Sequence, residues 1–232
     1  MKMKNKKADQ AAQRAARKLA RRKKPSLNRK AATKLQKQKI LIVCEGKNTE
    51  PSYFNQFRLA TATVKAIGDG YNTVSLVQQA HRLAQQEKYD QVWCVFDKDD
   101  FADNDFNNAI AIAEGYKFNV AYSNQAFEYW LILHFEDHQG GAKPRSDYGN
   151  TLNTYLTPFG ISYDAKSSKV ITSDIFELLL TKDPKTGKTY RQLAQERAAK
   201  NLQYHIDEGN TPAQSESCTL VHLLVQELEK FM

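Results

Sequence analysis

The chain has 232 residues, 41% of them hydrophobic, and a formal net charge of +8 at pH 7. This length suits one sizeable domain with or without an appendage. No apolar run approaches the roughly 18 residues of a membrane span, and no secretory signal is visible, so we expect no membrane partner. The three cysteines lack the spacing of metal ligands, and we expect thiols in a reducing cytoplasm.

The positive charge is concentrated at the N-terminus. Residues 1–39 hold 16 Lys or Arg and one acid, whereas residues 40–232 hold 18 Lys or Arg and 25 acids. We therefore expect residues 1–38 to form a basic tail, disordered or helical only when bound, that is attracted to the phosphates of DNA or RNA. A solubility tail, or a contact with another polyanion, is the alternative. The tail residues expected to contact nucleic acid are Arg14, Arg17, Lys18, Arg21, Arg22, Lys23 and Lys24.

Strands and helices are predicted to alternate after the tail. Short apolar runs such as Ile40–Cys44 and Val92–Phe96 are typical of strands buried on both faces. The predicted strands are residues 40–44, 61–67, 92–96 and 117–122, with helices beginning at Thr49 as cap and covering 73–86 and 106–114. This order predicts an α/β fold with a mainly parallel four-stranded sheet flanked by helices.

The rest of the chain reads as mostly helical. Residues 127–135 are apolar nearly all round, which predicts a deeply buried helix. A loop is expected at 140–150, and further helices are expected at 148–155, 173–180, 190–206 and 217–232. The predicted organisation is a tail over residues 1–38, a catalytic core over 39–136, and a helical extension over 137–232 that packs on the core.

Two of the predicted strands end in acids. Glu45 follows the first strand, while Asp97, Asp99 and Asp100 follow the third. The carboxyl ends of parallel strands meet at one edge of a sheet, so neighbouring strands would bring these acids together. Carboxylates of this kind hold one or two Mg²⁺ or Mn²⁺ ions for phosphodiester cleavage. A solvated acidic turn that merely ends a strand is the alternative.

Four further residues are candidates, each with a structural alternative. Lys47 could hold a phosphate, or it is a loop lysine paired with Glu50. Asn124 contacts substrate or caps the following helix. Glu128 is a further acid of the site or pairs with a Lys or Arg, because an unpaired buried carboxylate costs several kcal/mol. For His134, a core histidine is favoured over a catalytic one.

Three motifs carry a family resemblance, namely I-V-C-E-G-K-N-T-E-P-S-Y-F, V-F-D-K-D-D and A-Y-S-N-Q-A-F-E-Y-W-L-I-L-H-F. They resemble the RloB-like family, which is similar to the TOPRIM superfamily of topoisomerases, primases and nucleases. The resemblance covers residues 39–136 well and the remainder loosely. It implies a TOPRIM-like fold and a Mg²⁺-dependent phosphoryl-transfer site, with Glu45 as acid or base and Asp97 and Asp99 as metal anchors. Asp100 is an additional candidate that would reach the metal through water, and a plain surface acid is the alternative.

The resemblance also implies a biological setting, since RloB-like proteins are associated with restriction-modification and abortive-infection loci. We therefore expect a Mg²⁺-dependent nuclease that acts in anti-phage defence. Two alternatives stay open, a non-catalytic module that binds nucleic acid or a nucleotide and a primase-like nucleotidyl transferase. The choice of DNA or RNA, a partner subunit of a defence system, and oligomerisation also stay open.

Overall fold

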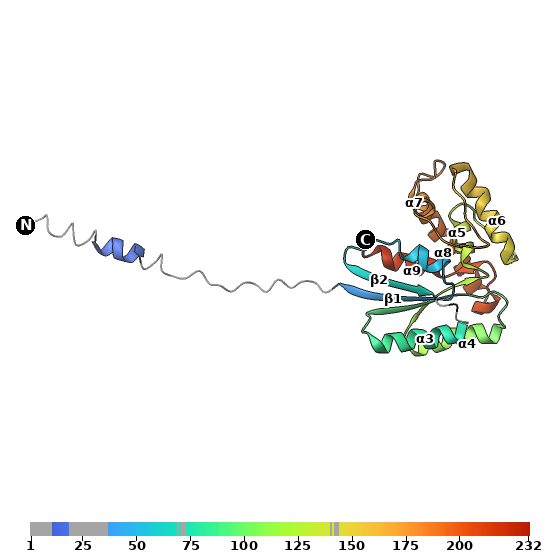
Figure 1. The fold of residues 1–232 in the computed structure, drawn as a ribbon, viewed down its shortest axis with the longest axis horizontal. Coiled ribbons are helices and arrows are strands. Elements are labelled where there is room, and N and C mark those ends of the chain that lie inside the picture. The colour runs from blue at the N-terminus through green and yellow to red at the C-terminus, as the bar shows by residue number, and fades with distance from the viewer. Residues whose placement is uncertain (1–10, 19–36, 69, 71–72, 140, 142–143) are drawn as a thin grey trace, which may run out of the picture. The chain divides into compact units, whose positions relative to one another are not determined.

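The computed structural model describes two separate units. The residues that it describes are 11–18, 37–68, 70, 73–139, 141 and 144–232. Contacts divide the chain into Met1–Gln36 and Lys37–Met232. In the first unit, residues 11–18 are helical and exposed (Figure 1). This short helix carries three of the predicted tail contacts, while the other four, at positions 21–24, lie outside the described residues.

A five-stranded sheet lies at the centre of the second unit. Its order is β2-β1-β3-β4-β5, and the strands are β1 Gln38–Cys44, β2 Ala62–Gly68, β3 Gln91–Asp97, β4 Asn119–Asn124 and β5 Cys218–Thr219. The first four are parallel to one another, and β5 is antiparallel to β4. The predicted mainly parallel α/β sheet is therefore confirmed, but the count of four strands is short by one. The missed strand has only two residues, too few to show a periodic pattern, and lies in a stretch predicted as helix.

Strand order places a switch point between β1 and β3. Cys44 of β1 pairs with Gly68 of β2 on one side and with Val95 of β3 on the other. The chain moves outward from β1 to β2 and then crosses back over β1 to form β3. In open α/β sheets, ligands bind at the carboxyl ends of the strands where the order reverses in this way.

Helices cover both faces of the sheet (Figure 1). One face is covered by α3 Thr73–Gln86 and α4 Asp103–Gly115, and the other by α2 Thr49–Phe54, α5 Phe127–Leu133, α8 Tyr190–Asp207 and α9 Val221–Glu229. Alternate residues of β1 serve the two cores, since Leu41 and Val43 pack with α3 and α4 while Ile40 and Ile42 pack on the opposite side. This alternation explains why the run is apolar at every position.

The remaining helices are α6 Arg145–Leu156 and α7 Ser173–Leu180, with short 3₁₀ turns η1 Thr157–Phe159 and η2 Pro212–Gln214. The start of α6 corrects the predicted loop over 140–150, since its residues from 145 onward are helical. Likewise, α9 begins four residues later than predicted, because the short strand β5 precedes it. Buried residues of α6, α7, α8 and α9 join the same apolar cluster as α2 and α5. Packing therefore makes no boundary at residue 136, and Lys37–Met232 is one compact unit.

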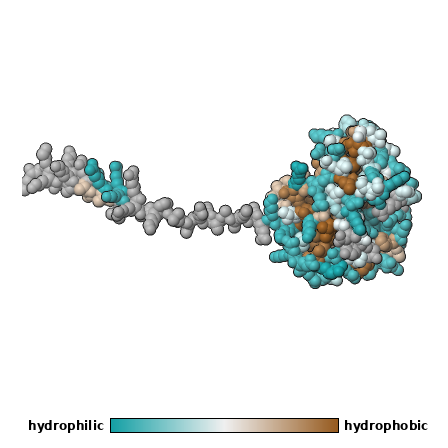
Figure 2. Space-filling model, viewed as in Figure 1, coloured by the Kyte–Doolittle hydropathy of each residue, from teal (hydrophilic) through white to brown (hydrophobic). Residues whose placement is uncertain are grey.

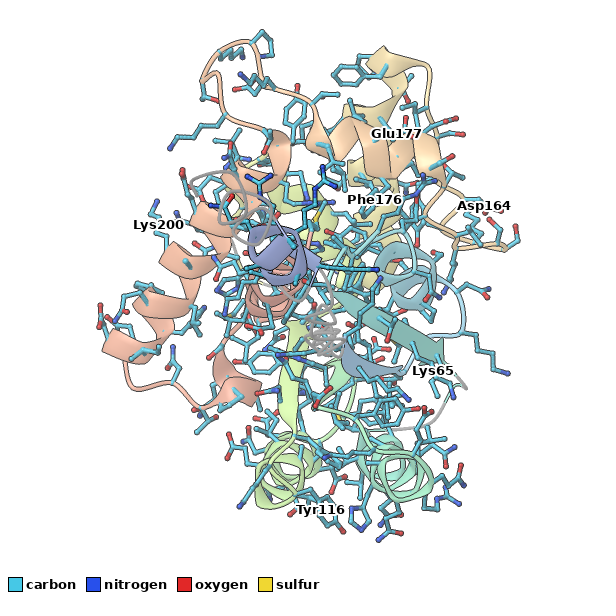
Figure 3. All side chains as sticks on the ribbon, turned by 90° about the vertical axis from the view of Figure 1, so that its left-hand side faces the viewer. Lys65, Tyr116, Asp164, Phe176, Glu177 and Lys200 are labelled. Carbon is cyan, nitrogen blue, oxygen red and sulfur yellow. The ribbon has the colours of Figure 1, made fainter. Side chains whose placement is uncertain are left out.

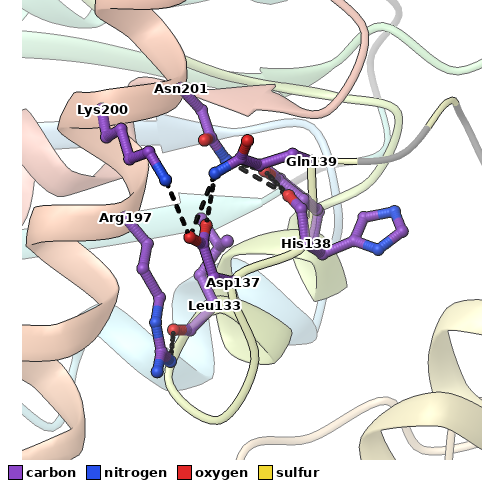
Figure 4. Close-up of polar contacts among 8 residues, drawn as sticks. Leu133, Asp137, His138, Gln139, Arg197, Lys200 and Asn201 are labelled. Atoms are coloured by element: carbon purple, nitrogen blue, oxygen red, sulfur yellow. Dashed lines mark hydrogen bonds and ion pairs between the residues drawn. The ribbon is translucent and has the colours of Figure 1, made fainter.

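Polar contacts attach the segment after α5 to α8 (Figure 4). Arg197 donates to the carbonyl oxygen of Leu133 at 2.7 Å, and Lys200 lies 3.1 Å from Asp137. Asn201 donates to the carbonyl oxygen of His138 at 3.2 Å. The Arg197 and Asn201 contacts satisfy backbone carbonyls at the end of α5 and in the segment that follows it.

The three cysteines are free and buried. Within the part of the chain that the structure describes, no helix has the length and apolar character to cross a membrane. On the face seen in Figure 2, hydrophobic surface is broken into separate areas with hydrophilic side chains between them. Scattered apolar side chains of this kind are usual on folded proteins and carry no functional signal.

Candidate active site

The acids of β1 and β3 meet at the switch point of the sheet. The backbone N–H of Glu45 donates to the carbonyl oxygen of Val95 at 2.9 Å, which extends the pairing of the two strands by one residue. The backbone N–H of Asp97 in turn donates to Oε2 of Glu45 at 3.2 Å. Glu45 is half-buried, and Asp97 is buried. The structure therefore brings together the two acids that sequence reasoning had placed at one edge.

The turn after β3 presents the next two acids. Asp99 is half-buried and has a positive φ of 41°, a conformation that Asp adopts more readily than most residues. Its N–H donates to the carbonyl oxygen of Gln125 at 3.1 Å, so the turn remains attached to the chain that leaves β4. Lys98 turns to Asp103, with Nζ 3.2 Å from its carboxylate. Asp100 is exposed, which leaves it the most peripheral of the predicted acids.

Glu50 is an acid of this edge that sequence reasoning considered only as a partner of Lys47. It is buried in the first turn of α2, and its Oε1 accepts the N–H of Gly46 at 3.2 Å. Burial raises the pKa of the Cys44 thiol, and the charges of Glu50 and Asp97 raise it further, because both lie near this cysteine. The one available signal was an acid in the first helical turn after the Glu-Gly pair.

Lys47 follows the Glu45-Gly46 pair at the end of β1. A Cβ built on Gly70 would lie 3.0 Å from Cε of Lys47 and 3.8 Å from its Nζ, so the lysine lies over the turn that follows β2. Among the residues that the structure describes, no ion pair joins Lys47 to Glu50. Lys47 is exposed beside the Glu45 turn.

A buried hydroxyl connects α2 to α5. The OH of Tyr163 donates to Oε1 of Glu128 at 2.8 Å and lies 3.2 Å from Oγ1 of Thr49. Burial raises the pKa of Tyr163, and the negative charge of Glu128 raises it further, so the phenol stays protonated and able to donate. Thr49 was predicted to cap α2, but the N-cap position is Asn48 and no side chain caps it. Nothing in the sequence pattern marked Tyr163, which is over a hundred positions from Thr49.

Glu128 faces a cavity. The residue is 6% exposed, and none of the Lys or Arg side chains that the structure describes forms an ion pair with it. A cavity of about 470 Å³ opens beside Glu128 and Tyr163, with Lys166 and Lys169 also in its wall. The site thus consists of an acidic edge and an adjoining cavity, with the Tyr163 hydroxyl between them.

Most of the chain matches one family. The family model for RloB-like proteins covers residues 40–228. The chain belongs to the RloB-like protein family. The match continues through the helices after residue 136, where the motifs had carried only a loose resemblance. No curated protein and no solved structure matches the chain.

In this RloB-like chain, the predicted site residue Asn124 forms hydrogen bonds within the fold. Asn124 is buried, and its amide nitrogen donates to the carbonyl oxygen of Ala213 at 3.2 Å. It does not cap α5, whose N-cap position is Ala126 without a side-chain bond. Its side chain instead holds η2 against β4, so the predicted cap is wrong, while the substrate contact stays a prediction.

His134 is fully buried in the core, as favoured from sequence. Its Nδ1 lies 3.0 Å from the carbonyl oxygen of Trp130 and so donates a hydrogen bond, while Nε2 has no partner within the described residues. Burial lowers the pKa of His134 to about 3, and the charge of Arg191 lowers it further. The ring is therefore neutral near pH 7 and belongs to the core of the family fold.

The acidic edge supplies hard oxygen donors of the kind that Mg²⁺ and Mn²⁺ prefer. In the described residues, no three His, Cys, Asp or Glu side chains are already gathered as a ligand set. Mg²⁺ commonly uses one or two protein carboxylates and completes its octahedron with water and substrate phosphate oxygens. A pair of carboxylates from Asp97 and Asp99 fits that requirement.

Proposed function

We propose that the chain is a metal-dependent nuclease of the TOPRIM type, which cleaves phosphodiester bonds in DNA or RNA. The observation that carries the proposal is the 3.2 Å hydrogen bond from the Asp97 N–H to the Glu45 carboxylate. It joins two acids across the switch point, where open α/β sheets bind their ligands. The membership in the RloB-like family supports the same assignment.

The residues of the edge take distinct roles in this proposal. Asp97 and Asp99 would hold Mg²⁺ or Mn²⁺, which neutralises charge on the phosphate and makes a bound water acidic when it is present. Glu45 transfers the proton, since its carboxylate is oriented by the Asp97 N–H and remains partly accessible. Glu50 adds negative charge at this edge, and Glu128 adds it in the adjoining cavity. Lys47, which is exposed next to the Glu45 turn, would bind a phosphate oxygen.

The basic tail recruits the substrate in this proposal. The helical residues 11–18 expose Arg14, Arg17 and Lys18, and the whole of residues 1–39 adds a charge of +15 from 16 cations and one acid. Recruitment by so many charges should weaken steeply as salt rises. A role in anti-phage defence rests on the family alone, and cells that express the chain should resist phage in plaque assays only with Glu45 intact.

Cleavage assays on single-stranded and duplex DNA and RNA test the nuclease. With Mg²⁺ or Mn²⁺ present, Glu45→Gln and Asp97→Asn should each lower the rate by on the order of 100-fold or more, because each removes a group that acts on the reacting atoms. Glu177→Gln is the matched control, since this exposed acid of α7 lies on the outside of the unit (Figure 3). Equal cleavage by the wild type and both site variants would reject the assignment.

A second candidate is a module that binds nucleic acid without cleaving it. The exposed Arg14, Arg17 and Lys18 of the helical residues 11–18 favour it, because they would bind phosphates whether or not cleavage follows. Such a module would bind nucleic acid equally well with and without a chelator and would turn over none of the substrates. Incubation with labelled nucleoside triphosphates, in the same set of assays, would reveal the product of a primase-like nucleotidyl transferase.

A further inference from the structure

The cavity beside the acidic edge is bounded by α6 and by the loop that follows η1. The two walls meet where Gly149 faces Ala165, since a Cβ on this glycine would lie 2.2 Å from the Cβ of Ala165. The volume of about 470 Å³ falls within the range of roughly 300–1,000 Å³ in which proteins hold small ligands. Only a glycine permits this approach of helix and loop, which closes the cavity on that side.

Hydrogen bonds fix the backbone conformation of the loop that carries Lys166 and Lys169. The Asp164 carboxylate, at the edge of the unit in Figure 3, accepts the N–H groups of Lys166, Ser167 and Ser168 at 3.1, 3.0 and 3.1 Å. The hydrogen bond from the Ser167 hydroxyl, followed by those from the three N–H groups, lowers the pKa of Asp164, so the carboxylate stays ionised and holds the loop in one conformation. Neither Lys166 nor Lys169 forms an ion pair with another described residue.

The wall of the cavity carries both signs of charge. Lys166, Lys169 and Asp164 come from the loop, and the Asp164 carboxylate is occupied by the loop's own N–H groups. The buried Glu128 carboxylate accepts the Tyr163 hydroxyl, which in turn contacts Thr49 of α2. An anionic group would be repelled by Glu128 and attracted by Lys166 and Lys169. Asn150, exposed in the α6 wall, offers an amide donor and an amide acceptor of the kind that reads the edge of a base.

Building on the nuclease proposed above, we propose that this cavity holds one unpaired nucleotide of the substrate strand. Lys166 and Lys169 bind its phosphate, and Asn150 faces its base. The strand then continues on the α2 side of the cavity, which places the neighbouring phosphodiester at Glu45 and Asp97. A base in a duplex is stacked and paired, so it reaches such a cavity only in a single strand or after being turned out of the helix. The substrate class is therefore nucleic acid with unpaired nucleotides.

Binding measurements on the full chain in a chelating buffer separate this proposal from cleavage. The ligands are fluorescent single-stranded RNA and DNA of one sequence and the corresponding duplexes, followed by fluorescence anisotropy. The double variant Lys166→Ala/Lys169→Ala should bind the single strands about tenfold more weakly, and the slope of log K against log salt should become shallower by about 0.7 for each phosphate that the variant no longer neutralises. Duplex binding through the tail should change little.

The matched control is Lys182→Ala/Lys185→Ala, which removes the same charge from exposed lysines outside the cavity wall. The control should bind single strands as the wild type does. Equal binding by both double variants would overturn the cavity proposal, even if Glu45→Gln still abolishes cleavage. If the Lys166→Ala/Lys169→Ala variant loses affinity equally for single strands and duplexes, the proposed preference for unpaired nucleotides is overturned. If the Lys166→Ala/Lys169→Ala variant binds only single strands more weakly, and the wild type cleaves none of the substrates, the nuclease assignment is rejected and the cavity proposal stands.

The same binding titrations determine whether the bound nucleotide carries ribose or deoxyribose. A carboxylate accepts a hydrogen bond from a 2′-hydroxyl, so a contact of Glu128 with ribose would make RNA bind more tightly than DNA of the same sequence. Glu128→Gln should then reduce the difference between the two sugars. Equal affinity of the wild type for both single strands would restrict recognition to the phosphate and the base.

Discussion

Gly68 packs so closely against Gly46 that the Glu45-Gly46 turn should not tolerate a side chain at position 68. Gly68 is the last residue of β2 and pairs with Cys44 in the parallel ladder. A Cβ at Gly68 would lie 1.8 Å from the carbonyl oxygen of Gly46 and 2.9 Å from Cγ of Pro51, whereas ordinary contacts begin at 3.4 Å. In Gly68→Ala, the Glu45-Gly46 turn must therefore move by more than 1 Å, because the obstacle is backbone and cannot change rotamer.

Two effects should follow from this displacement. Overpacking of a closed site typically lowers the free energy of unfolding by about 1–3 kcal/mol, and we expect the upper part of that range. A misplacement of about 1 Å at reacting groups costs on the order of 100-fold in rate. Glu45 adjoins Gly46, so cleavage should fall by about that factor under conditions where the variant is still folded.

Gly115→Ala is the matched control, because a Cβ at Gly115 would have nothing within 4 Å. Its free energy of unfolding should exceed that of the wild type by at most about 1 kcal/mol, because alanine restricts the unfolded chain. Urea unfolding followed by circular dichroism gives the stabilities, and the Mg²⁺-dependent cleavage assay gives the rates. The reasoning about the turn fails if Gly68→Ala matches Gly115→Ala in both measurements.

Two further predictions concern buried polar groups. Burial lowers the pKa of His134 to about 3 and that of His222 to about 4, from an ordinary 6.5. Below pH 6.5 these histidines therefore bind protons in the unfolded chain but not in the folded chain. The free energy of unfolding should be highest above pH 6.5 and should fall toward pH 4. At roughly pH 5 the loss should be about 2 kcal/mol for each histidine. Urea unfolding across this range should show His222→Gln losing about half of the decline, and an unchanged slope would contradict this origin. Tyr163→Phe leaves the Glu128 carboxylate without its hydroxyl donor and should lower the free energy of unfolding by about 1–2 kcal/mol in the same experiment. Unaltered stability of this variant would mean that the hydroxyl contributes nothing to the fold.

The alternation of strands and helices was predictable from local pattern. Each core strand is an apolar run that serves both faces of the sheet, and α3 shows a one-sided apolar stripe whose limits, Thr73–Gln86, agree with those predicted. Parallel strands have their carboxyl ends at one edge, so Glu45 and Asp97 were expected to be close if their strands were neighbours. The observed order β2-β1-β3 meets that condition, which the local pattern alone does not determine.

Contacts between distant segments were not predictable in the same way. The strand β5 forms only because Cys218 meets Asn124 in the folded chain. Tyr163 reaches Thr49 and Glu128 from a loop with no regular pattern, and that loop makes the cavity together with α6. The residue types of the acidic edge were thus determined by the amino-acid sequence alone. The cavity that adjoins it was decided by tertiary packing, because its walls come from parts of the chain whose approach depends on the whole core.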